Sequence, residues 1–133
     1  MSSAKQAAAL IVEDDRGESE LAALVLAEFN LNVIQVASGE DALSCLFDRA
    51  EEIGVVLIDV HLEGDMDGIA LAQRIGILWP AHSVLVTSGD LNAGRERLPP
   101  RATFIPKPWR PLDIVAAAER AARADHSVRA IQL

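Results

Sequence analysis

The chain has 133 residues, half of them apolar, and a formal net charge of −8. This length corresponds to one ordinary domain with a sizeable core, and the single cysteine excludes an internal disulfide. The acidic surplus contains no basic cluster, which argues against nucleic-acid binding. No apolar run approaches the roughly 20 residues of a membrane span, and the start lacks a signal-peptide pattern. We therefore expect a cytoplasmic protein with no membrane partner.

Strand-like runs alternate with helical patterns along the chain. Short apolar runs predict buried strands at 8–13, 32–36, 55–59, 83–87 and 103–106. Helical spacing follows Asp15 and recurs over 38–50, 67–80 and from Pro111 onward. This alternation predicts an α/β fold with a five-stranded parallel sheet and helices on both faces. We expect a single domain over 1–133, with a core of about 8–124 and a tail at 125–133.

Two details refine this architecture. Pro106 ends the last strand-like run, and proline lacks a ladder donor, so we expect that strand at the sheet edge in an order of 2-1-3-4-5. The stretch 88–102, "SGDLNAGRERLPPRA", is broken by Gly94 and by two prolines, so we expect the fourth helix to be short or irregular. The helical patterns place Phe47 and Leu112 on inward faces.

Polar residues stand where the predicted strands end. Glu13 and Asp14 follow the first run, Asp59 ends the third, Thr87 ends the fourth, and Lys107 follows the fifth. The carboxyl ends of parallel strands share one edge of a sheet, so these side chains should converge. Carboxylates ~5 Å apart at an effective dielectric of ~20 repel by about 3 kcal/mol per pair. A hard cation such as Mg²⁺ offsets that repulsion, and with a hydroxyl and a lysine the set suits phosphoryl transfer.

Each of these residues also has a purely structural interpretation. Glu13 and Asp14 would favour the dipole of the following helix, and Asp15 is expected to begin that helix instead of binding metal. Asp59 would be a plain strand-end acid, and Lys107 a solvated surface lysine. The convergence of all of them at one edge favours the chemical interpretation.

The segments "LIVEDD", "VVLID", "VLVTSG" and "FIPKPW" occur in this order with helix-sized gaps. Together they resemble the landmark motifs of bacterial response-regulator receiver domains over about 8–124. The resemblance implies a flavodoxin-like receiver fold and makes Asp59 the phosphoacceptor. It further implies Mg²⁺ ligands from Glu13, Asp14, Asp59 and the backbone carbonyl of His61.

The same resemblance implies that Thr87 and Lys107 contact the phosphoryl group. Thr87 and Phe104 match the switch positions of the family, and the Lys107–Pro108 bond is expected to be cis. One departure is the loop after the acceptor, "DVHLEGDMDG", which replaces the usual Met-Pro pair and puts Asp67-Gly68 one residue further on. The loop 62–67 is therefore longer and more acidic than in many receivers.

The expected function is that of a single-domain phosphoacceptor in a two-component phosphorelay. A sensor histidine kinase or a histidine phosphotransfer protein would phosphorylate Asp59. We expect no DNA-binding output domain in the chain, so output would pass to an unknown protein partner. The protein would be a monomer or a phosphorylation-dependent dimer. It would not be an enzyme, apart from self-phosphorylation and slow self-dephosphorylation.

Two other functions stay open. One is a phosphorylation-independent binding module with a receiver fold: the presence of every motif residue argues against it, and the altered loop 62–67 keeps it open. The other is a phosphatase of the haloacid dehalogenase type, which also uses an aspartyl nucleophile and Mg²⁺. That type needs a second aspartate two residues after the nucleophile, where this chain has His61.

Overall fold

The computed structural model describes residues 8–28, 31–90, 94–117 and 119. The strands are β1 Ala8–Val12, β2 Asn32–Val36, β3 Ile53–Asp59, β4 Ser83–Ser88 and β5 Thr103–Pro106. The α-helices are α1 Arg16–Ala27, α2 Gly39–Arg49 and α3 Gly68–Leu78, with 3-10 turns η1 Ala50–Glu52 and η2 Arg95–Arg97. Residues 111–117 are also helical. The predicted tail, 125–133, lies outside the described residues.

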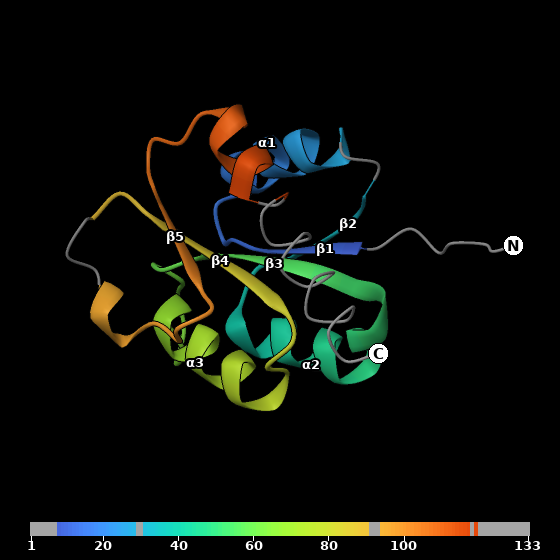
Figure 1. The fold of residues 1–133 in the computed structure, drawn as a ribbon, viewed down its shortest axis with the longest axis vertical. Helices are drawn as coiled ribbons and strands as arrows, with labels where there is room; N and C mark the ends of the chain where they lie inside the picture. Colours follow the sequence, from blue (N-terminus) through green and yellow to red (C-terminus); the bar gives the residue numbers. More distant parts are fainter. Residues whose placement is uncertain (1–7, 29–30, 91–93, 118, 120–133) are drawn as a thin grey trace, which may run out of the picture.

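The strands form one parallel sheet in the order β2-β1-β3-β4-β5, which confirms the predicted fold class. Figure 1 shows α1 and the helical segment 111–117 on one face and α2 and α3 on the other. β1 is buried along its whole length, and β3 and β4 nearly so, because helices cover both of their faces. Consecutive residues of β1 supply opposite cores: Leu10 packs toward α2 and α3, and Ile11 toward α1.

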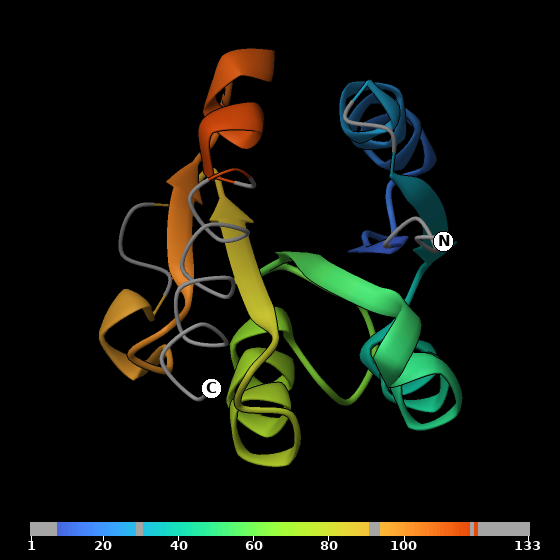
Figure 2. The ribbon, with the colours of Figure 1, turned by 45° about the vertical axis from the view of Figure 1, so that its right-hand side comes forward.

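The edge position of β5 agrees with its proline. β5 pairs with β4 alone among the described strands, and Pro106 lies opposite Ser88. A missing N–H costs least there, because an edge strand has one side without a ladder partner. Because β3, β4 and β5 are parallel, their carboxyl ends lie at the same edge of the sheet (Figure 2).

The fourth helix is reduced to η2 within the described residues. Gly94 precedes this turn with φ 87, a left-handed conformation that glycine adopts without strain. The prediction of a short or irregular element is confirmed. Arg95 of η2 places its guanidinium 4.4 Å from the ring centroid of Phe104 on β5.

Each of the helices α1, α2 and α3 begins at a residue whose side chain caps its N-terminus. Asp15 accepts a hydrogen bond from the Glu18 N–H at 2.9 Å, and Ser38 and Asp67 cap α2 and α3 in the same way. Asp15 is therefore the residue that begins α1, as predicted. No helix among the described residues is long and apolar enough to cross a membrane.

Two predicted inward side chains are exposed. Phe47 of α2 is 67% exposed and makes an edge-to-face contact with Trp79, with ring centroids 5.0 Å apart. Leu112 is 71% exposed, because Ile114 and Ala117 take the inward positions of that helical segment. The predictions for Phe47 and Leu112 were wrong: a helix buries only part of an apolar stripe.

Candidate functional site

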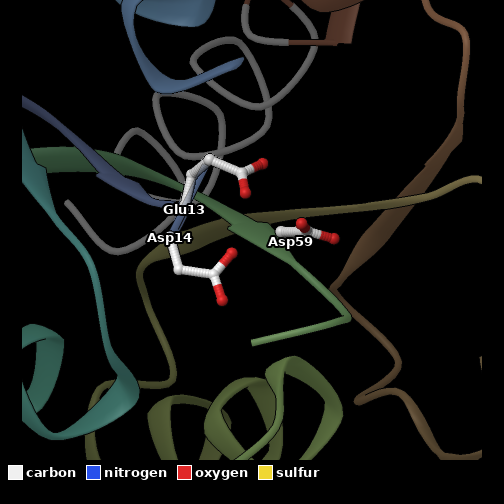
Figure 3. Close-up of side chains that lie close together, drawn as sticks. All are labelled: Glu13, Asp14 and Asp59. Carbon is white, nitrogen blue, oxygen red and sulfur yellow. The ribbon is translucent and has the colours of Figure 1, made fainter. Parts of the chain in front are cut away.

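The sheet register brings the predicted site residues to one edge. Val12 of β1 lies opposite Ile58 of β3, so Glu13 and Asp14 follow β1 beside Asp59. Asp59 in turn lies opposite Thr87 of β4. One carboxylate oxygen from each of Glu13, Asp14 and Asp59 lies within 4.8 Å of the others (Figure 3).

The acids of this cluster differ in exposure. Glu13 and Asp59 are almost completely buried, and Asp14 is partly exposed. Burial raises the pKa of Glu13 to about 8, with a smaller contribution from the Asp59 carboxylate beside it. A carboxyl group that holds its proton at neutral pH shows how strongly this site disfavours further negative charge in the absence of a cation.

Lys107 enters the site from the loop after β5. Its backbone N–H donates to the Ser88 carbonyl at 2.8 Å, which fixes the loop against the end of β4. Its ammonium nitrogen lies 3.4 Å from Asp59 Oδ2 and 3.5 Å from Glu13 Oε1. A shorter contact, 2.7 Å, joins it to Glu18 Oε1. The Lys107–Pro108 bond is cis, as predicted.

Opposing effects act on the ammonium group. Burial of Lys107 works against its charge, but the hydrogen bond from Lys107 to Glu18 and the carboxylates of Asp59 and Glu13 outweigh that cost. Together they raise the pKa of Lys107. The sequence did not identify Glu18 as a member of the site, since an acid in the first turn of a helix is ordinary.

Thr87 places a buried hydroxyl group beside Asp59. Thr87 is buried, and its Oγ1 makes no hydrogen bond within the part of the chain that the structure describes. Such an atom costs about 1–3 kcal/mol when left unsatisfied. An incoming oxygen next to Asp59 would satisfy it.

The loop after Asp59 wraps around the acidic cluster. The His61 N–H donates to Asp59 Oδ1 at 3.1 Å, and the Glu63 N–H donates to Asp14 Oδ2 at 2.9 Å. Gly68 closes the loop: its N–H bonds the Val60 carbonyl, and any Cβ there would collide with the Asp59 backbone. The displaced Asp67-Gly68 pair therefore serves both to cap α3 and to seat the loop.

Phe104 and His61 contribute less to the geometry of the site. Phe104 is half-buried, lies opposite Val86 and packs on the core beneath α2 and α3. The side chain of His61 is exposed. The switch role of Phe104 and the carbonyl role of His61 stay predictions.

The three carboxylates fit a Mg²⁺ ion. All potential ligands are carboxylate oxygens, and their separation of at most 4.8 Å allows them to share one ion. Glu13, Asp14 and Asp59 would hold the metal.

The fold and the carboxylate cluster together define a class, the parallel α/β receiver domain with an acidic site at the carboxyl ends of its strands. Residues 9–119 match the family model of the response regulator receiver domain. The chain belongs to this family.

Individual proteins show the same likeness. The chain is 32% identical over 106 residues to the two-component response regulator ARR21 of Arabidopsis thaliana, covering 79% of this chain and 17% of that protein. A crystal structure of NtrX from Brucella abortus is 27% identical with a TM-score of 0.85, covering 96% of this chain and 29% of NtrX. The chain therefore spans less than a third of either relative. A receiver domain from Clostridium thermocellum, 19% identical, shares the fold with a TM-score of 0.84 over 92% of this chain and 98% of that one.

Proposed function

We propose that this receiver domain is a phosphoacceptor, with Asp59 as the residue that a histidine kinase or a histidine phosphotransfer protein phosphorylates. The observation that carries the proposal is the environment of Asp59. Its carboxylate is buried beside two other acids and lies 3.4 Å from the Lys107 ammonium. Asp59 also lies opposite Thr87, whose hydroxyl makes no hydrogen bond to any residue that the structure describes. Charge compensation and an unused donor at one carboxylate suit an incoming phosphoryl group.

In the proposed reaction, an Asp59 carboxylate oxygen attacks the phosphorus of a phosphohistidine. The P–N bond breaks, the imidazole leaves with the electron pair and takes up a proton, and an acyl phosphate forms on Asp59. Lys107 pairs with the phosphoryl oxygens, and the Thr87 hydroxyl donates to one of them. Mg²⁺ bound by Glu13, Asp14, Asp59 and the His61 carbonyl would supply further neutralisation of the phosphoryl charge.

The proposed output is a change in protein–protein contacts. Thr87 Oγ1, which bonds none of the described residues, would gain a hydrogen bond from the presence of the phosphoryl group, and this would bias the end of β4 toward a second conformation. Phe104 would follow that movement from the neighbouring strand. We infer cytoplasmic action on a downstream protein, as a monomer or a phosphorylation-dependent dimer. We also infer no turnover of external substrates beyond self-phosphorylation and slow self-dephosphorylation.

One observation favours the alternative, a binding module that works without phosphorylation. The Glu63 N–H donates to Asp14 Oδ2, so the acidic loop 62–67 is tied directly to one of the expected metal ligands. A module of this kind would keep the loop closed and bind its partner through it.

Intact-protein mass spectrometry after incubation with acetyl phosphate separates these functions. The proposal predicts a phosphate-sized gain that requires Mg²⁺ and disappears in Asp59→Asn. No gain in the wild-type protein, together with no binding of beryllofluoride, would favour the binding module. Release of phosphate from a generic phosphomonoester would favour the phosphatase instead.

A further inference from the structure

The shortest contact of the Lys107 ammonium is with Glu18. The nitrogen lies 2.7 Å from Glu18 Oε1, against 3.4 Å from Asp59 and 3.5 Å from Glu13. Only the first distance is that of a strong charge-assisted hydrogen bond. The lysine that should serve the phosphoacceptor is therefore bonded most closely to a different acid.

Both partners of this contact are held by their backbones. The Glu18 N–H donates to the N-cap Asp15, and the Lys107 N–H donates to the Ser88 carbonyl. The contact thus joins two fixed points, the first turn of α1 and the end of β5. The cavity that these side chains share with Asp59 and Thr87 measures about 10 Å³, room for about one water molecule.

The carboxylate of Glu18 does not make the hydrogen bond that is common for an acid at its position in a helix. An acid three residues after an N-cap commonly folds back onto the N-cap N–H. Here the Asp15 N–H donates to Glu13 Oε2 instead, at 3.1 Å, while Glu18 turns to Lys107. The Glu18 carboxylate therefore contacts a residue of the site instead of the N-cap of its own helix.

We propose that Glu18 is a positioning residue that holds the Lys107 ammonium in a hydrogen bond in the unphosphorylated protein and so slows phosphorylation of Asp59. The inference rests on the proposed phosphoacceptor function and specifies its regulation. On phosphorylation, the added negative charge draws the ammonium from Glu18 toward the phosphoryl oxygens. The Glu18 contact has to be broken in the forward reaction.

The effect is confined to one direction of the chemistry. Phosphorylation starts from the state in which Lys107 contacts Glu18, so removing Glu18 lowers the activation free energy of phosphorylation. Hydrolysis starts from the phosphorylated state, in which Lys107 has already left Glu18, so its rate should change little. The side chain of Glu18 is 47% exposed, which places the contact in the range of partly screened ion pairs. Such pairs correspond to about a two- to fivefold change in an equilibrium or a rate.

The test compares Glu18→Gln with Glu20→Gln. Glu20 is an exposed acid on the same helix, and the three ion-pair partners of Lys107 among the described residues do not include it. Both variants therefore lose the same charge from α1. Three quantities are measured for each: the rate of phosphorylation by acetyl phosphate with Mg²⁺, the affinity for beryllofluoride with Mg²⁺, and the rate of aspartyl-phosphate hydrolysis.

We expect Glu18→Gln to speed phosphorylation and tighten beryllofluoride binding by about two- to fivefold relative to Glu20→Gln, with hydrolysis unchanged. A purely structural role would shift the melting temperature without this split between the two rates. Equal values for the two variants would overturn the inference while the proposed function stood. A wild-type protein that takes up neither phosphate nor beryllofluoride would overturn both, and that failure is visible before any variant is made.

Discussion

Mg²⁺ affinity should fall steeply as the pH is lowered below 8. Burial raises the pKa of Glu13 to about 8, so the folded protein without metal keeps this carboxyl group protonated at neutral pH. A metal ligand must be deprotonated, and binding therefore has to expel that proton. Raising the pH toward 8 removes the Glu13 proton in advance and therefore strengthens Mg²⁺ binding.

The magnitude follows from the fraction of Glu13 that is ionised. With a pKa of about 8, about half is ionised at pH 8 and about 1% at pH 6. The apparent affinity should therefore fall by about 50-fold between these values, close to tenfold per pH unit at the lower end.

Isothermal titration calorimetry with Mg²⁺ at pH 6, 7 and 8 measures this dependence. Repeating it at pH 6 in two buffers of different ionisation enthalpy should show the release of about one proton per ion. The matched variant is Glu13→Gln, which keeps the size of the side chain but cannot titrate. We expect its affinity to be nearly independent of pH over this range. An equally steep dependence in the variant, or a flat one in the wild-type protein, would refute the role assigned to Glu13.

Three further predictions concern the surroundings of Asp59. Thr87→Val removes a buried hydroxyl that bonds none of the residues described in the structure, so its free energy of unfolding in urea should stay equal or rise by about 1 kcal/mol, while phosphorylation slows; clear destabilisation would show that the hydroxyl is satisfied. Gly68→Ala should lower the free energy of unfolding by about 1–3 kcal/mol, because its Cβ meets the Asp59 backbone, and Gly17→Ala on α1 serves as the control that should not be destabilised. The amide resonance of Glu63 should shift on Mg²⁺ addition in NMR spectra, because its N–H donates to Asp14, an expected ligand of the ion; an unmoved resonance would mean that Asp14 does not bind the ion.

The sequence was sufficient to predict that the candidate site residues converge, because of the geometry of parallel sheets. Asp59, Thr87 and Lys107 each stand at or just past the end of a strand, and neighbouring parallel strands bring those ends together. The strand order and the reduced fourth helix followed from proline and glycine, whose backbone restrictions act locally. These features depend on chain direction and local conformation, which a sequence pattern carries.

Other features depend on tertiary distances that no local pattern contains. Phe47 lies next to the fully buried Leu46, and helical periodicity alone does not tell how wide a stripe the neighbouring layer covers. Glu18 has the spacing of a helix-capping acid, and only the folded position of Lys107 shows that its carboxylate is used elsewhere. The unsatisfied hydroxyl of Thr87 is likewise visible only after its surroundings are packed.

Chemical mapping of the modified residue decides whether Asp59 receives the phosphoryl group. The protein is incubated with acetyl phosphate and Mg²⁺, treated with borohydride to reduce the acyl phosphate to an alcohol, and sequenced by tandem mass spectrometry. We expect homoserine at position 59 and an unmodified aspartate there when Mg²⁺ is withheld. Homoserine at position 14 instead, or reduction at no carboxylate of the chain, would contradict it.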